Sequence, residues 1–240
     1  MKVVVCKDYD EMSQKAFEVM KEVVTSKPGV VLGLATGSSP VGLYKCMIKD
    51  HEENGTSYKD VVTYNLDEYV GIDRSNPQSY YTFMKENLFD HIDIDPNNTH
   101  VPYGSTKEDC EGYEKELEKV SIDLQLLGIG RNGHIGFNEP GTTFDEMTHI
   151  VDLTQSTIEA NARFFDNDMN KVPKQAITMG IGTIMKSKKV LMVVSGPEKA
   201  EAVKATVEGP VTTDMPASVL QNHPDVTLVV DEAAASLLSK

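Results

Sequence analysis

The stretch VVLGLATGSSPVGLYKCMIKDHEE, residues 30–53, decides the fold, because it joins an apolar run to an amphipathic segment through a short polar loop. The run over residues 30–35 is short and almost wholly apolar, which is typical of a strand buried inside a parallel sheet. Proline is tolerated in the first turn of a helix, so a helix is predicted from about Pro40 to residue 53. The stretch therefore predicts a strand, a loop and a helix in succession.

The same alternation of short apolar runs and longer amphipathic segments continues along the chain. Further strands are predicted at residues 2–6, 61–65, 122–127, 190–195 and 226–231. Helices are predicted after a capping residue, Asp8, and at residues 79–89, 106–119, 154–165, 198–207 and 232–238. Strands separated by helices predict an α/β fold: an open, mostly parallel, doubly wound (Rossmann-like) sheet with helices on both faces. Since neither repeats nor a linker interrupt the pattern, we predict a single domain over residues 1–240.

The acidic composition narrows the range of partners. A formal net charge of −14 argues against nucleic acid and against an anionic membrane. An anionic small molecule is still possible, because a helix N-terminus and one or two cations can hold a phosphate on an acidic protein. The three cysteines form no CxxC pair and are expected to be inert thiols. With no signal peptide and no apolar stretch of about 20 residues, we expect a cytoplasmic protein.

Polar motifs follow four of the predicted strands. These motifs are TGSSP at residues 36–40, NLDEY at 65–69, GRNGH at 130–134 and SGPEK at 195–199. In open parallel sheets, ligands bind beyond the carboxyl ends of the strands, which share one edge. We therefore predict that the four motifs converge on one binding site.

Two of these motifs and one arginine are candidates for binding a phosphate. Backbone N–H groups and small hydroxyls in the turn of Thr36, Gly37, Ser38 and Ser39 suit an anion at a helix start, although Ser38 or Ser39 could simply cap that helix. Lys199 lies in the first turn of a predicted helix and could reach a phosphate, or it could be a solvated surface lysine.

Arg163, in the motif NARFFDND, offers the bidentate geometry that phosphate favours. The alternative for this arginine is a surface salt bridge.

The remaining motifs carry groups suited to acid–base chemistry. Asp67 and Glu68 follow a strand, and because neighbours in extended chain point oppositely, at most one of them is expected to face the cleft as a general base. His134 follows Gly133 in a polar loop, and Glu139 is close enough in sequence to orient it, although a lone histidine is more often structural. The loop supplies too few ligands for a zinc site. The residues thus predict an enzyme that acts on a small phosphorylated metabolite by acid–base chemistry, without a metal.

The motifs TGSSP, NLDEYVG, GIGRNGHIGFNEPG, NARFFDND and SGPEKAEAV closely resemble those of the glucosamine-6-phosphate deaminase family, and the similarity extends over nearly the whole chain. This resemblance implies conversion of glucosamine 6-phosphate and water to fructose 6-phosphate and ammonia, in amino-sugar catabolism and without a cofactor. The related 6-phosphogluconolactonases share a GxxGH-type loop but lack FNEPG and LDEY, so a lactonase-like hydrolase is the alternative enzyme. A non-catalytic sugar-phosphate sensor is the alternative outside enzymes.

The resemblance also implies roles for individual residues. Asp67 would move a proton between C2 and C1 of the sugar, while His134 would assist ring opening and Glu139 would orient the imidazole. Asn132 stands where some members of the family carry Asp, so the histidine would depend more on Glu139. The implied substrate-binding residues are Thr36, Gly37, Ser38, Ser39, Gly133, Arg163 and Lys199. Residues 154–176 resemble the mobile lid of the family.

One departure from the family pattern bears on regulation. Larger hexameric members bind an allosteric activator through basic residues shortly after NEP, where this chain has His149 and Val151. We therefore expect a short, non-allosteric enzyme that is a monomer or a small homo-oligomer.

Overall fold

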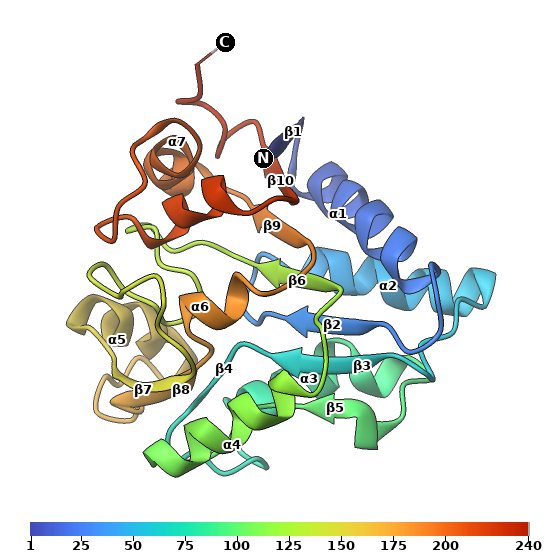
Figure 1. Cartoon of the computed structure of the whole chain (residues 1–240), viewed down its shortest axis with the longest axis horizontal. Helices are drawn as coiled ribbons and strands as arrows, with labels where there is room; N and C mark the ends of the chain where they lie inside the picture. Colours follow the sequence, from blue (N-terminus) through green and yellow to red (C-terminus); the bar gives the residue numbers. More distant parts are fainter. Residues whose placement is uncertain (240) are drawn as a thin grey trace.

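A seven-stranded parallel sheet forms the centre of the computed structural model, which describes residues 1–239 and, within them, all side chains except those of residues 156 and 160 (Figure 1). Its order is β1 (Lys2–Cys6), β10 (Val226–Asp231), β9 (Val190–Val194), β6 (Leu124–Leu127), β2 (Val31–Leu34), β3 (Val62–Asn65) and β5 (Thr99–His100). All the strands predicted from the sequence are present in this sheet.

Helices cover both faces of the sheet, as predicted. The chain moves in one direction across the sheet through α1 (Tyr9–Val24), α2 (Val41–Asn54) and α3 (Tyr80–Asn87), and it returns through α4 (Lys107–Glu118), α6 (Ile181–Ile184) and α7 (Ala200–Glu208). Because crossovers between parallel strands are right-handed, the two series lie on opposite faces (Figure 1). The connections that leave the neighbouring strands β2 and β6 run in opposite directions across the sheet. Open α/β sheets bind ligands at such a point. The predicted α/β class is confirmed.

A second, three-stranded antiparallel sheet was not predicted. It consists of β4 (Asp67–Tyr69), β8 (Gln175–Thr178) and β7 (His149–Asp152), with β8 in the middle. The chain enters it directly after β3, since Leu66 alone separates β3 from β4. The second sheet therefore extends from the carboxyl edge of the main sheet and carries one of the predicted motifs with it.

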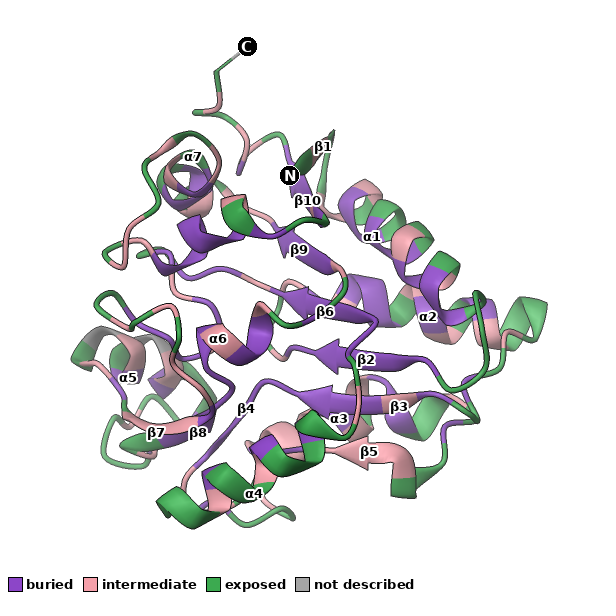
Figure 2. Cartoon of the chain, in the orientation of Figure 1, coloured by how far each residue is buried: buried purple, intermediate pink, exposed green. Residues whose placement is uncertain are grey.

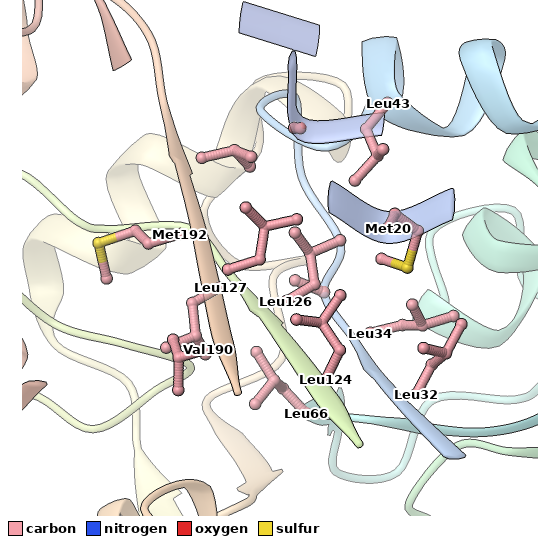
Figure 3. Close-up of a cluster of buried hydrophobic side chains, with 14 of the residues drawn as sticks. Met20, Leu32, Leu34, Leu43, Leu66, Leu124, Leu126, Leu127, Val190 and Met192 are labelled. Carbon is pink, nitrogen blue, oxygen red and sulfur yellow. The ribbon is translucent and has the colours of Figure 1, made fainter. Parts of the chain in front are cut away.

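The central strands are buried on both faces. Figure 2 shows β2, β6 and β9 buried along their length, and every residue of these strands is buried. In Figure 3, side chains from these strands meet Met20 of α1 and Leu43 of α2 in the main core. A smaller apolar cluster around Tyr69, Phe137 and Ile158 fixes the second sheet to α5 (Gln155–Asn161). Such two-sided burial explains why the central strands are almost wholly apolar.

One predicted helix is absent, and another was wrong in extent. Residues 232–238 form successive turns instead of a helix, because the Asp231 carboxylate accepts the Ala234 N–H (2.7 Å) and the later bonds are mostly of the i to i+3 type. The helix predicted over residues 154–165 divides into α5 and a 3₁₀ turn, Ala162–Phe164. It ends where Asp166 and Asn167 adopt left-handed conformations, with φ of 56° and 59°.

Candidate active site

The loop after β2 presents backbone N–H groups at the start of α2. Pro40 is the N-cap residue, and no side chain caps the helix, so neither Ser38 nor Ser39 serves as the cap. Gly37 has a φ of 94°, a conformation that glycine adopts without strain. The turn of Thr36 to Ser39 thus meets an uncapped helix N-terminus, an arrangement that suits an anion.

A tyrosine from another helix fixes the shape of this turn. The Tyr9 hydroxyl donates to the Ser38 carbonyl (2.8 Å) and accepts the Gly42 N–H (2.8 Å). Gly42 permits this approach, because a Cβ there would lie 2.8 Å from the Tyr9 ring and 2.1 Å from Ser13 Oγ. The sequence did not indicate this role for Tyr9, whose partner lies 29 residues away.

The Tyr9→Phe variant tests the contribution of this bridge. Losing both hydrogen bonds frees the turn, so we expect KM for a sugar phosphate to rise about tenfold with kcat little changed. Tyr58→Phe is the matched control, because the buried Tyr58 hydroxyl has no hydrogen-bond partner within residues 1–239. Steady-state kinetics on both variants check the expectation, and equal KM values would contradict it.

Three cations interact at this part of the molecule: Lys199 and Arg131 follow the neighbouring strands β9 and β6, and Arg163, in the 3₁₀ turn Ala162–Phe164, is near enough for its charge to act on Lys199. Lys199, in the 3₁₀ turn Pro197–Lys199 after β9, donates to the Ile129 carbonyl (2.8 Å). Burial lowers the pKa of Lys199; the carboxylate of Glu198 opposes this shift, and the charges of Arg131 and Arg163 add to it. In the described part of the chain, none of these three cations forms a salt bridge with a carboxylate. An anion such as phosphate would relieve their mutual repulsion.

Arg131 was not predicted as a site residue, although it lies in the histidine loop. Its nearness to Lys199 depends on how the loops after β6 and β9 meet, which the sequence does not display. Arg163 is exposed, and its guanidinium lies 4.6 Å from the centre of the Phe164 ring. The predicted alternative of a surface salt bridge for Arg163 finds no carboxylate partner among the described residues.

The loop after β6 brings His134, Asn132 and Glu139 together. The Asn132 amide donates to Glu139 Oε2 (2.5 Å), and Asn132 Oδ1 lies 2.7 Å from His134 Nδ1. Glu139 Oε2 and His134 Nδ1 are 3.5 Å apart. Because Asn132 presents its oxygen to the ring, Nδ1 carries the hydrogen, and Nε2 of the neutral imidazole is left as an acceptor.

Glu139 is ionised in this arrangement. Burial acts to raise its pKa, but hydrogen bonds and the charge of His134, together with donors from Asn132 and Thr157, lower the pKa below its ordinary value. Thr157 belongs to α5, so a second element of the structure reaches this carboxylate. The His134 imidazole can therefore take up and release a proton at Nε2. The negative charge of Glu139 stabilises the imidazolium that forms when the proton is taken up.

Asp67 and Glu68 point in different directions, as expected for neighbours in a strand. Glu68 accepts the backbone N–H groups of Tyr69, Tyr80 and Tyr81 at 2.9–3.0 Å, and so it stabilises the start of α3. Asp67 is only 7% exposed, and burial together with the charge of Glu68 raises its pKa to about 8. A carboxyl with this pKa is a stronger base than an ordinary aspartate.

Asp67 adjoins the histidine loop. It pairs with Thr178 across the second sheet, and the Thr178 hydroxyl accepts the Phe137 N–H (3.1 Å). A Cβ at Gly136 would lie 3.5 Å from Asp67 Oδ2, so the loop backbone passes directly over the carboxyl. The second sheet therefore delivers the aspartate to the edge where the histidine loop ends.

Gly133 packs closely against the segment of residues 215–217. Its φ is 82°, and a Cβ there would come within 1.9 Å of Met215 Sδ. Its carbonyl accepts the Ala217 N–H at 2.9 Å. Close packing against residues 215–217 accounts for this glycine, and its contact with a sugar stays a prediction.

Two further features complete the description. Within residues 1–239, no group of three or more His, Cys, Asp or Glu side chains is arranged to hold a metal ion. Among the described helices, none has the length and apolar character needed to cross a bilayer.

Comparisons with known proteins identify the relatives of this chain. The family model of glucosamine-6-phosphate isomerases/6-phosphogluconolactonase matches residues 8–229. Glucosamine-6-phosphate deaminase of Clostridioides difficile is 54% identical over 243 residues, covering 100% of this chain and 97% of the relative. The deaminase of Thermoanaerobacter pseudethanolicus is 51% identical over 242 residues, covering 99% of this chain and 95% of that protein.

Solved structures give the same assignment. A monomeric glucosamine-6-phosphate deaminase superposes with a TM-score of 0.96 at 46% identity, covering 99% of this chain and 100% of that one. The 6-phosphogluconolactonase of Trypanosoma brucei superposes with a TM-score of 0.80 at 18% identity, covering 99% and 98%, and this likeness concerns the fold alone. The chain therefore belongs to the family of glucosamine-6-phosphate isomerases and 6-phosphogluconolactonases.

Proposed function

We propose that the chain is a glucosamine-6-phosphate deaminase, which converts glucosamine 6-phosphate and water to fructose 6-phosphate and ammonia. The observation that carries this proposal is the buried carboxyl of Asp67 beside the histidine loop. The loops that follow β2 and β9 lie at the same edge of the sheet. Relatives that are 51% and 54% identical over 95% and 97% of their length carry the same name. A lactonase needs water to attack an ester and has no use for a base that moves protons between carbons.

The phosphate-binding end of the site lies away from the reacting carbons. The turn of Thr36 to Ser39 supplies backbone N–H groups and hydroxyls, and Arg163 and Lys199 supply charge, with Arg131 as an added cation. Binding energy from the 6-phosphate holds the sugar with C2 directed at Asp67. A substrate without the phosphate is expected to lose turnover as well as affinity.

The acid–base groups act in sequence on the bound sugar. His134 uses the acceptor at Nε2 to assist opening of the pyranose ring, while Glu139 and Asn132 keep the ring oriented. Asp67 then takes the proton from C2 and returns it to C1 through an enolamine. Water replaces the nitrogen at C2, which releases ammonia and leaves the ketose.

The raised pKa of Asp67 predicts a strong dependence on pH. The base must be ionised to act, and its pKa is about 8, so the active fraction of free enzyme grows as pH rises. For one essential ionisation at this pKa, kcat/KM rises about 50-fold from about pH 6 to pH 8. Initial rates at low substrate, corrected for ionisation of the substrate itself, check this, and a midpoint near pH 4 would contradict it.

Ammonia release from glucosamine 6-phosphate tests the function directly. The purified protein is incubated with the sugar phosphate in the presence of EDTA, and ammonia and fructose 6-phosphate are both measured. Equal yields of the two products support the proposal. Hydrolysis of 6-phosphogluconolactone without ammonia release would favour the lactonase, and a thermal shift with the sugar phosphate but no turnover would favour the sensor.

The remaining features belong to the same proposal. The protein acts in the cytoplasm on amino-sugar phosphates, as a monomer or small homo-oligomer, in a single domain over residues 1–240. Residues 154–176, which include α5, serve as a lid over the site. His149 and Val151 lie on β7 in place of basic side chains, so allosteric activation is not expected.

A further inference from the structure

A hydroxyl from α5 donates a hydrogen bond to the second carboxylate oxygen of the buried Glu139. Thr157 Oγ1 donates to Glu139 Oε1 (2.9 Å), while the Asn132 amide donates to Oε2 (2.5 Å). Thr157 lies 18 residues after Glu139 and on a different element. Both oxygens of the carboxylate are thus occupied, one from the histidine loop and one from the helix.

The direction of each hydrogen bond in this network is fixed by chemistry. An ionised carboxylate only accepts, so Thr157 uses its hydrogen on Glu139. Thr154 Oγ1 lies 2.9 Å from Thr157 Oγ1, and it must therefore be the donor of that pair. On the other side, Asn132 Oδ1 accepts from His134 Nδ1. A continuous chain of hydrogen bonds runs from the start of α5 to the imidazole, with Glu139 as its acceptor.

Helix α5 reaches the second sheet through one further polar contact. Asn161 Nδ2 donates to the Tyr69 hydroxyl (2.9 Å). The apolar contacts of α5 belong to the smaller cluster around Tyr69, and Ile158 is part of it, separate from the main core. The position of α5 and the hydrogen bonds of Glu139 are therefore linked through the Thr157 hydroxyl.

We propose that Thr157 is a positioning residue for the acid–base chemistry, acting through Glu139 on His134. The inference rests on the proposed function, because it assigns the hydroxyl a part in that reaction. His134 is the titratable group that faces Glu139 among the described residues, at 3.5 Å, and the other neighbours, Asn132 and Thr157, are neutral. Losing the hydroxyl leaves the carboxylate with one donor fewer and free to turn away from the ring.

The test compares Thr157→Val with Thr157→Ser and Gln155→Ala. Valine keeps the shape and removes the donor, so kcat is expected to fall about tenfold or more with KM changed less than about twofold. The midpoint of the Glu139 titration, followed by NMR of its carboxyl, is expected to move to higher pH, because ionised Glu139 loses a hydrogen bond. Serine restores both the rate and the midpoint. Gln155 pairs with Glu159 on the surface of the same helix, and its variant keeps both.

Three results would overturn the inference. They are a Glu139 titration midpoint in Thr157→Val that matches the parent, a loss of rate that Gln155→Ala reproduces, and a serine variant that is as slow as the valine variant. Failure of the parent enzyme to release ammonia would defeat the proposed function instead. In that case, NMR titration of the Glu139 carboxyl in the parent and Thr157→Val proteins still tests the inference, and an unchanged midpoint would overturn it.

Discussion

Replacing Asp67 by asparagine is expected to reduce kcat by about 10²-fold or more, because a positioned base contributes at least this factor. The affinity for the phosphate group is expected to stay the same. The amide keeps the size of the carboxyl but cannot accept a proton from carbon. The anion-binding turn of Thr36 to Ser39 lies on a different strand end and is untouched. Turnover is measured by ammonia release, and affinity by calorimetry with fructose 6-phosphate.

The stability of the same variant provides a check that it is folded. The pKa of Asp67 rises from 3.8 to about 8 on folding, so the folded state resists ionisation of this carboxyl. The contribution of Asp67 to stability is therefore fully present below about pH 4 and is lost as pH rises through about 8. Asparagine never ionises, so Asp67→Asn is expected to have the higher Tm at about pH 9 and nearly the same Tm near pH 4.

A control variant distinguishes the loss of the base from the loss of a negative charge in the same region. Asp73 lies just beyond β4 but is exposed, and its carboxylate accepts the N–H and hydroxyl of Ser75. Asp73→Asn is expected to retain the parent rate. Near-normal turnover in Asp67→Asn, or an equal loss in both variants, would remove Asp67 from the mechanism.

The main sheet could be predicted from the sequence because its strands are buried on both faces and each stands apart from its flanking helices. The strands Val31–Leu34 and Leu124–Leu127 are mostly apolar runs between polar segments, and both were predicted. The second sheet could not be predicted, since β4 has three residues, two of them carboxylates that are rare in strands. Its pairing with residues 175–178 depends on contacts far apart in the sequence.

The candidate site also contains residues that could be predicted from the sequence and residues that could not. His134, Asn132 and Glu139 lie within one loop, so their association could be anticipated from spacing. Tyr9 and Thr157 could not be identified, because their partners Ser38 and Glu139 lie 29 and 18 residues away on other elements. The helix expected at residues 232–238 has alanines and leucines that favour a helix, yet a segment this short is not stable without packing. The Asp231 side chain accepts the Ala234 N–H, and the segment forms a series of turns instead of a helix.

Gly130→Ala is expected to lower kcat by about 10²-fold through displacement of His134, since a shift of about 1 Å in a catalytic group has this effect. A Cβ at residue 130 would lie 2.2 Å from Cε1 and 2.3 Å from Nδ1 of the imidazole, closer than atoms can approach. The ring must move away, and it then loses the bond from Nδ1 to Asn132 Oδ1. Initial rates of ammonia release measure the effect.

Gly128→Ala is the matched control for this prediction, because it lies two residues earlier in the same loop and a Cβ there meets no atom within 4 Å. Gly130 also lacks the positive φ that would make alanine strain the backbone, and the three atoms nearest to the added Cβ all belong to the His134 imidazole. We expect Gly128→Ala to keep the parent rate and both variants to keep the parent affinity for inorganic phosphate. If Gly130→Ala retained the parent rate, the orientation of His134 would be irrelevant to turnover; if both variants were equally slow, the loss would come from the loop backbone instead of the imidazole.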